Sequence, residues 1–207
     1  MSVRRLAEEQ PESFEFTPEN LDWAKQQIAK YPEGRAASAV ISLLWRGQEQ
    51  NDGWVSEPMI RCVGDLLGMP YIRVLEVATF YTMFNLAPRG KYLIQVCKTT
   101  PCWLRGSDDV TEVVKRKLGV GAGKVTEDGL FSWMEVECLG ACCNAPMIQV
   151  NDDYYEDLDA AKTEALLDAF ARGETPAPGS QIGRRSSEPV GGLTSLTGSA
   201  GQNGGDS

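Results

Sequence analysis

Residues 92–102 of the chain read YLIQVCKTTPC. The apolar first half of this stretch predicts a buried β-strand, and Cys97 stands where the strand ends. The same arrangement recurs further along, where a predicted strand over residues 130–136 leads to Cys138, with Cys142 following. Two strands that each end in a pair of cysteines therefore define the part of the chain from which fold and site can be predicted.

The apolar pattern around these strands completes a small domain. A helix is predicted to run from Ser107, as its N-cap, to Leu118, a third strand covers residues 147–150, and a last helix covers about residues 159–172. The order strand, helix, strands, helix is typical of a small α/β sandwich. If the two cysteine-bearing strands are neighbours in one sheet, their loops leave the sheet at the same edge.

The residues before this domain predict four helices. Thr17, followed by proline, is a typical helix start, and further helices are predicted around residues 36–44 and after Ser56. Residues 71–86 are apolar on several sides, and three helices need a fourth surface to cover their apolar faces, which favours a helix here as well. We therefore predict a helical bundle over residues 17–88.

The two ends of the chain differ in composition from the part between them. Residues 1–16 form a polar lead, and residues 173–207 hold no aromatic residue, while Gly, Ser and Pro make up 18 of their 35 residues. Such a composition cannot bury enough apolar surface to offset the entropy of ordering it. The predicted fold class is therefore α+β: a helical bundle, an α/β domain over residues 89–172, and a disordered C-terminal tail.

The overall composition argues against several classes of protein. The formal net charge of −9 argues against binding to nucleic acid, and no apolar run is long enough for direct membrane insertion. The first ten residues lack the apolar stretch of a secretory signal, so we expect the chain to remain in the compartment where it is made. The absence of histidine excludes imidazole ligands and bases, and six cysteines favour metal or redox chemistry.

Four cysteines form the candidate site: Cys97, Cys102, Cys138 and Cys142. If the two strands are neighbours, the four thiolates converge as a [2Fe–2S] cluster requires. The loops hold small residues such as Gly140, which let backbone N–H groups approach the cluster sulfurs. The spacing favours an iron–sulfur cluster. A thiolate zinc site remains open, as does a thiol–disulfide pair, although the Cys-x-x-Cys motif of that class is absent.

Two other cysteines and a glycine-rich run carry weaker signals. Cys62 falls in the apolar stripe of a predicted helix, and we assign both this residue and Cys143 to packing. The run GVGAGK at residues 119–124 is not a P-loop, because Leu118 and Val125 stand where that motif has Gly and Ser or Thr. Since no convincing site for NAD or flavin is found, we expect a partner to supply the electrons.

The segments IQVCKTTPCWLRG at residues 94–106 and VECLGACCNAP at residues 136–146 resemble the thioredoxin-like [2Fe–2S] ferredoxin subunit of respiratory complex I. The segment ATFYTMF at residues 78–84 is similar to the N-terminal helical part of that family. The resemblance covers about residues 17–172 and leaves both ends outside it. It implies a thioredoxin-like fold for the α/β domain.

For the site, the resemblance implies that Cys97, Cys102, Cys138 and Cys142 ligate one [2Fe–2S] cluster, and that this chain holds no catalytic residue. The implied role is that of an electron-transfer subunit of NADH:quinone oxidoreductase. Its partners would be a flavoprotein that binds FMN and NADH, whose FMN supplies the electron, and the rest of complex I. The implied location is cytoplasmic and peripheral, at the inner face of the bacterial inner membrane, or on the matrix side in an organelle.

Two alternatives to this role remain open. Relatives in NAD-linked hydrogenases and formate dehydrogenases carry the same diaphorase module, so the parent complex can differ while the site stays the same. A zinc-stapled interaction module without redox activity would use the same four thiolates in a different way.

Overall fold

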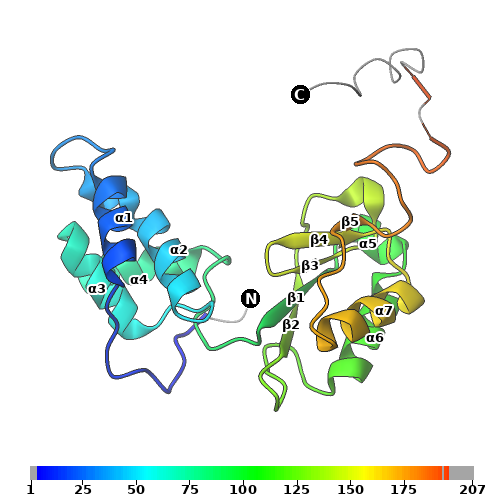
Figure 1. Ribbon diagram of the computed structural model, residues 1–207, viewed down its shortest axis with the longest axis horizontal. Coiled ribbons are helices and arrows are strands. Elements are labelled where there is room, and N and C mark those ends of the chain that lie inside the picture. Colours follow the sequence, from blue (N-terminus) through cyan, green and yellow to red (C-terminus); the bar gives the residue numbers. More distant parts are fainter. Residues whose placement is uncertain (1–3, 193, 196–207) are drawn as a thin grey trace. The chain divides into compact units, whose positions relative to one another are not determined.

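The computed structural model describes residues 4–192, 194 and 195. The chain forms two compact units that meet at the Arg89–Gly90 peptide, and each unit is described by itself (Figure 1). The sequence places this boundary one residue earlier, between residues 88 and 89.

The first unit is helical, as the sequence predicts. Its elements are α1 (Pro18–Ile28), the 3₁₀ helix η1 (Ala36–Ala39), α2 (Val40–Gln50), α3 (Glu57–Leu67) and α4 (Tyr71–Phe80). Thr17 caps α1, because its side-chain oxygen accepts a hydrogen bond from the backbone N–H of Asn20 at 3.3 Å. The fourth helix ends at Phe80, earlier than the sequence predicts, and Tyr81 after it has extended backbone angles.

The core of the first unit is formed by apolar side chains from all four α-helices and from the segment after α4. Leu43 and Leu44 of α2, Met59 of α3 and Phe84 are fully buried. The Arg4 guanidinium donates to carbonyl groups at the end of α4 and in the following turn, which are those of Ala78, Thr79, Tyr81 and Phe84. The N-terminal segment thus satisfies carbonyls that a longer helix would otherwise have used.

The second unit is a mixed sheet with helices. Its elements are β1 (Tyr92–Cys97), α5 (Thr100–Leu104), α6 (Ser107–Leu118), β2 (Phe131–Val136), the 3₁₀ turn η2 (Cys142–Asn144), β3 (Ile148–Val150), β4 (Asp153–Glu156), α7 (Ala160–Ala171) and β5 (Gly179–Ser180). The strand order is β2-β1-β3-β4-β5 (Figure 1). Apolar side chains of α6 and α7 share one core with strands β1 to β4. The predicted mixed helix-and-sheet fold class is confirmed.

The pairing of β1 and β2 positions the two cysteine loops. These strands are parallel, as the prediction requires, and Cys97 lies opposite Val136 in their register. Gly90 is the first residue of the second unit, and its backbone lies directly against β2. A Cβ at this position would lie 2.3 Å from the carbonyl carbon of Phe131, so only glycine fits. Both loops that follow the strands therefore leave the sheet at the same edge.

The caps of α6 differ in part from the prediction. Gly119 ends the helix in the left-handed conformation with φ +65°, as a glycine C-cap should. The predicted Ser107 N-cap is wrong, because Gly106, with φ +100°, occupies the cap position. Ser107 is instead the first helical residue, and its buried hydroxyl has no hydrogen-bond partner among the described residues.

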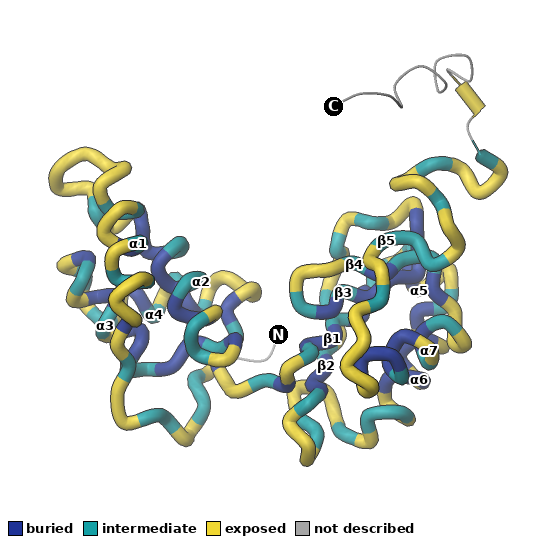
Figure 2. The backbone as a smooth tube through the Cα atoms, viewed as in Figure 1, coloured by how far each residue is buried: buried dark blue, intermediate teal, exposed yellow. Residues whose placement is uncertain are grey.

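Part of the predicted tail lies against the second unit. Gly179 pairs with Tyr155 in the parallel pairing of β5 with β4, and the Tyr155 hydroxyl donates to the carbonyl of Pro176 at 3.1 Å. We call residues 176–188 the C-terminal strap, along which half-buried positions are separated by exposed ones (Figure 2). The rest of the predicted tail beyond Ser195, like residue 193, lies outside the described residues.

None of the described helices is both long and apolar enough to cross a bilayer.

Candidate metal centre

The four candidate cysteines occupy the loops at the shared edge of β1 and β2. Cys97 is the last residue of β1 and Cys102 lies on α5, and both are buried. Cys138 follows β2 and Cys142 begins η2, and both are exposed. One cysteine pair therefore faces the protein interior and the other faces solvent.

The thiols of each pair interact with each other. The Sγ atoms of Cys138 and Cys142 lie 3.5 Å apart. Two thiolates on one tetrahedral metal, each with a metal–sulfur bond of about 2.3 Å, would be about 3.8 Å apart. Interaction between the Cys97 and Cys102 side chains lowers the pKa of Cys97 and raises that of Cys102. The loop of Cys138 and Cys142 thus brings two sulfurs close to the separation that a shared metal demands.

Electrostatic interactions also connect the two pairs. Burial, together with the hydrogen bond and the negative charge of Cys97, raises the pKa of Cys102 to about 12. The hydrogen bond to Cys138 raises the pKa of Cys142, and desolvation and the charges of Cys138 and Cys97 add to this shift. The charge of Cys97 therefore acts on Cys142 in the other pair as well as on Cys102 in its own.

One cysteine of each pair is stabilised as a thiolate. Burial raises the pKa of Cys97, but hydrogen bonds from the Thr99 hydroxyl and from backbone N–H groups, including that of Leu139, outweigh it and lower the pKa overall. The backbone N–H of Gly140 lowers the pKa of Cys138, and it lies 3.4 Å from the sulfur. Since the thiolate is the form that binds metal, these donors prepare the site for it.

Gly140 shows why the second loop needs a glycine. Its φ of +85° lies in the left-handed region, where side chains are strained. This conformation aims the N–H group of Gly140 at the Cys138 sulfur. The structure therefore shows one small loop residue directing its backbone N–H at a cysteine sulfur.

Hydrogen bonds from the neighbouring strand hold the second loop in place. The Tyr154 hydroxyl donates to the carbonyl of Leu139 at 2.7 Å, and the N–H of Asp157 donates to the carbonyl of Asn144 at 2.7 Å. Behind the loop, Met147 packs with the buried cysteine pair. The loop of Cys138 and Cys142 is thus held by residues in β4 and directly after it.

The donor set can be tested against possible metal groups. Within the described residues, no three His, Cys, Asp or Glu side chains surround a single point closely enough to hold one metal ion. A two-iron cluster makes a different demand, because it takes two thiolates at each iron. Four thiols arranged as two neighbouring pairs fit that group.

One family model matches most of the chain. The model named thioredoxin-like [2Fe-2S] ferredoxin matches residues 24–171, which is most of the chain. The chain belongs to the thioredoxin-like [2Fe-2S] ferredoxin family.

Two curated relatives are identical to the chain at more than half of the aligned positions, and both are named as subunits of NADH-quinone oxidoreductase. The chain is 53% identical over 201 residues to such a subunit from Rhizobium meliloti (strain 1021), over 95% of this chain and 73% of the relative. It is 56% identical over 156 residues to the corresponding protein of Rickettsia bellii (strain RML369-C), over 75% of this chain and 93% of the relative.

A solved structure shares the ferredoxin's fold at lower sequence identity. The crystal structure of NAD+-reducing [NiFe]-hydrogenase in the air-oxidized state superposes with a TM-score of 0.56 at 20% identity. The match covers 65% of this chain and spans about a quarter of the hydrogenase chain (23%). At this identity the likeness concerns the fold alone.

The ferredoxin's remaining cysteines differ from each other. Cys62 is half-buried and packs against the helical core, as predicted. Cys143 is exposed, so its assignment to packing is wrong. Sequence reasoning also missed α5, which carries Cys102 where a loop is predicted, although Thr99 followed by Thr100 and Pro101 is a recognisable helix start.

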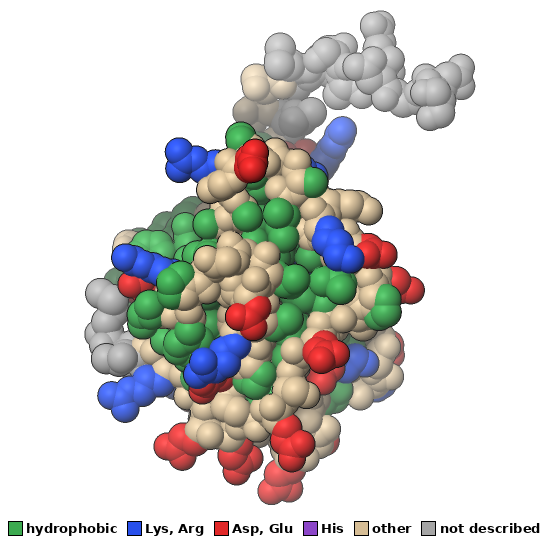
Figure 3. All heavy atoms as spheres, turned by 90° about the vertical axis from the view of Figure 1, so that its left-hand side faces the viewer, with side chains coloured by type: hydrophobic (Ala, Val, Ile, Leu, Met, Phe, Trp, Pro, Cys, Tyr) green, Lys and Arg blue, Asp and Glu red, His purple; other side chains and the backbone are tan. Residues whose placement is uncertain are grey.

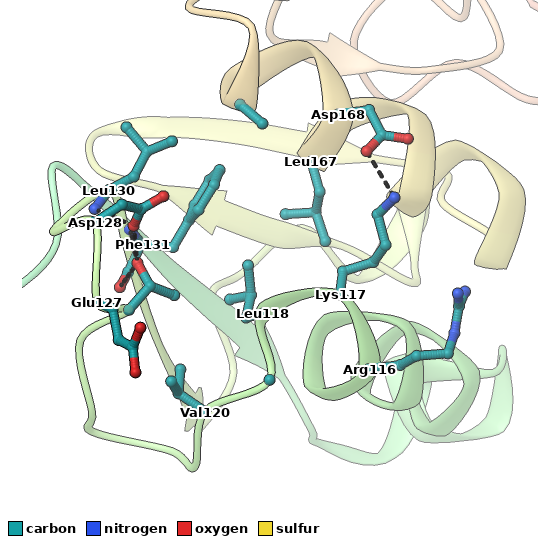
Figure 4. A pocket seen from close by; sticks show the side chains of 13 residues that line it. Arg116, Lys117, Leu118, Val120, Glu127, Asp128, Leu130, Phe131, Leu167 and Asp168 are labelled. Carbon is teal, nitrogen blue, oxygen red and sulfur yellow. Dashed lines mark hydrogen bonds and ion pairs between the residues drawn. The ribbon is translucent and has the colours of Figure 1, made fainter.

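A pocket in the ferredoxin domain lies apart from these cysteines. Residues at the end of α6, before and at the start of β2, and on α7 line it, and none of them is a cysteine (Figure 4). Its two lining cations are already paired, since Lys117 contacts Asp168 at 2.6 Å and Arg116 contacts Glu164 at 2.9 Å. Among the described residues that line the pocket, no cation is therefore left for an anionic ligand.

The helical unit of the ferredoxin exposes several large apolar side chains. Those of Ile72, Phe80, Tyr81 and Met83 are exposed, and Phe80 is 76% accessible. In Figure 3, apolar side chains lie among charged ones at the surface.

Proposed function

We propose that the chain holds one [2Fe–2S] cluster on Cys97, Cys102, Cys138 and Cys142 and serves as the electron-transfer subunit of an NADH:quinone oxidoreductase. The observation that carries this proposal is the meeting of four thiols, as two pairs, at one edge of the sheet. Membership of a [2Fe-2S] ferredoxin family and relatives named as NADH-quinone oxidoreductase subunits support it.

The residues of the site would bind and tune such a cluster. When bound, the cluster supplies one-electron transfer, which side chains alone do not provide. The buried pair, Cys97 and Cys102, anchors its inner side, while Cys138 and Cys142 keep its outer side near solvent. The N–H of Gly140 donates to sulfur, and such donors stabilise added negative charge and so raise the reduction potential.

The electron donor in this proposal is a flavoprotein partner that binds FMN and NADH. No P-loop or dinucleotide fingerprint occurs in the chain, and residues 119–124 follow a helix rather than a strand. The exposed cysteine pair would allow a donor to approach without opening the fold. As part of such a complex, the chain would lie peripherally at the inner face of the bacterial inner membrane.

Metal analysis of the full chain, purified without oxygen from cells grown on ordinary medium, tests the cluster. We expect two irons and two acid-labile sulfides per chain, and an EPR signal from a single reduced [2Fe–2S] cluster after dithionite. Stoichiometric zinc without sulfide would instead establish the zinc-stapled module and overturn the proposal.

The parent complex can be tested separately. The same module in an NAD-linked hydrogenase or formate dehydrogenase is the second candidate. The relatives at 53% and 56% identity favour the quinone reductase, because the hydrogenase likeness is only 20% identical. Affinity purification of the tagged chain from its native cells, with mass spectrometry, should recover a flavoprotein and quinone-reductase subunits. Recovery of a hydrogenase or formate dehydrogenase large subunit would assign the chain to the other complex.

A further inference from the structure

A nearly buried ion pair attaches the C-terminal strap to the second unit. The side chains of Arg184 and Asp157 are only 9% and 7% exposed. The guanidinium forms two bonds to the carboxylate, from Nη2 to Oδ1 at 2.5 Å and from Nε to Oδ2 at 3.0 Å. Ser180 of the strap donates to the same carboxylate at 2.6 Å. Paired and hydrogen-bonded in this way, two charges can remain out of water.

The same guanidinium also reaches the loop that carries Cys142. Its Nη2 donates to the carbonyl of Cys143 at 2.9 Å, while Nη1 donates to the carbonyl of Glu188 within the strap at 2.8 Å. Arg184 therefore joins three parts of the chain: the strap, the residue after β4 and the backbone directly after Cys142.

Asn144 makes a second connection between this loop and the strap. Its side-chain amide donates to the carbonyl of Ser186 at 2.9 Å and to the Glu156 carboxylate at 2.5 Å. The two residues that follow Cys142 are thus both bonded to the strap. The 3₁₀ turn that contains them is only three residues long, and so short a turn has few internal bonds to fix its direction.

We infer that the C-terminal strap orients the loop of Cys142 for cluster binding, and that Arg184 is its positioning residue. This inference rests on the proposed function, since it concerns how one of the four proposed ligands is held. Cys142 is exposed, so packing alone does not fix its side chain. Hydrogen bonds from residues next to a metal ligand set the direction of that ligand and the stability of the metal group. Arg184 donates such a hydrogen bond to the Cys143 carbonyl, directly after Cys142.

A matched set of variants can separate positioning from general stability. Arg184→Gln removes the guanidinium group that donates to both the Asp157 carboxylate and the Cys143 carbonyl. Arg184→Lys keeps the charge but cannot make the same set of bonds. Arg185→Gln is the control, because it makes the same chemical change at the exposed neighbouring residue. Asp157→Asn removes the partner charge, and asparagine tolerates the φ of +57° at this position.

The experiment uses the full chain with its cluster, purified without oxygen. We measure the rate of cluster loss to an iron chelator, the EPR g values of the reduced cluster and the thermal unfolding midpoint. Arg184→Gln should lose the cluster roughly 10- to 100-fold faster and shift the g values. Asp157→Asn should act in the same direction, Arg184→Lys should lie between Arg184→Gln and wild type, and Arg185→Gln should match wild type.

Each other outcome decides against the inference. If Arg184→Gln and Arg184→Lys lower the unfolding midpoint but keep the wild-type rate of loss and g values, the strap only adds stability. If Arg185→Gln has the same effect as Arg184→Gln, charge rather than positioning is responsible. If the wild-type chain carries no [2Fe–2S] cluster, the proposed function fails first, and this result is distinct from the other two.

Discussion

Cys97 and Val136 lie opposite each other in the parallel register of β1 and β2. Because parallel strands run in the same direction, the loops that follow them emerge at one edge of the sheet. Cys138, two residues beyond Val136, thus comes near the end of β1, where Cys97 stands. An antiparallel pairing would have placed the two cysteine pairs at opposite ends of the strands.

The first prediction concerns serine replacement of the proposed ligands. The four single variants are Cys97→Ser, Cys102→Ser, Cys138→Ser and Cys142→Ser. Each should abolish or severely perturb the [2Fe–2S] EPR signal, because each removes one thiolate from the cluster. The controls Cys62→Ala and Cys143→Ala should leave the signal largely intact. If Cys143→Ala removes the signal while Cys142→Ala retains it, the neighbouring cysteine is the ligand.

The second prediction concerns the close approach of Gly90 to β2. A Cβ at Gly90 would lie 2.3 Å from the Phe131 carbonyl carbon and 2.6 Å from the Ser132 nitrogen, so Gly90→Ala should push β2 away. We expect a loss of about 1–3 kcal/mol in the opening free energy of β1 and β2. Hydrogen exchange of peptides from these strands measures this quantity.

The control for this prediction is Gly121→Ala, because a Cβ at Gly121 meets no atom within 4 Å. Its effect should stay within about 0.5 kcal/mol. Equal effects of the two substitutions would show that the close approach at Gly90 does not matter for the sheet.

The third prediction concerns Arg4 at the end of α4. Its guanidinium donates to the carbonyl of Thr79 at 3.0 Å and to that of Tyr81 at 2.7 Å. Arg4→Gln should therefore weaken the turn over residues 79–84 by about 1–3 kcal/mol, measured as faster amide exchange in that peptide. Arg5→Gln, at an exposed side chain, should leave exchange there unchanged. Unchanged exchange in Arg4→Gln as well would mean that the N-terminal segment does not stabilise the turn.

The fourth prediction concerns acid release of the strap. Burial raises the pKa of Asp157, but hydrogen bonds from Arg184 and Ser180 outweigh it and lower the pKa overall. A carboxyl with a depressed folded pKa stabilises the fold above its unfolded value of about 3.9 and loses that contribution as pH falls through the lower folded value. The attachment of the strap should therefore persist through mildly acidic pH and be lost only below about pH 4.

The Nε–H resonance of Arg184 in a ¹⁵N-labelled chain can report this transition. In wild type it should hold its position down to about pH 4 and then move as Asp157 is protonated. Asp157→Asn should show no such acid transition. A wild-type transition centred clearly above pH 4 would contradict the depressed pKa of Asp157.

Features that depend on a few adjacent residues could be predicted from the sequence. Thr17, which precedes a proline, was expected to start α1, and its side-chain oxygen caps that helix. The apolar runs that precede Cys97 and Cys138 also indicated the strands β1 and β2. That these strands are parallel neighbours was a condition for grouping the four thiols, and the structure supplies it.

Features that depend on distant partners could not be predicted. The strap has a composition typical of a tail, and what holds it is the pairing of Arg184 with Asp157, 27 residues earlier in the chain. Nothing in the pattern around either residue specifies the other. In the same way, α4 ends at Phe80 where Arg4, more than 70 residues earlier, takes up the free carbonyls.

The 3.5 Å separation of the Cys138 and Cys142 sulfurs has a consequence for the life of the newly made chain. A disulfide has an S–S bond of about 2.05 Å, so these two exposed thiols need to approach by only about 1.5 Å to form one. Air oxidation before iron and sulfide arrive would remove both from the ligand set. Under the proposed function, a chain oxidised in this way would have to be reduced before it could bind the cluster.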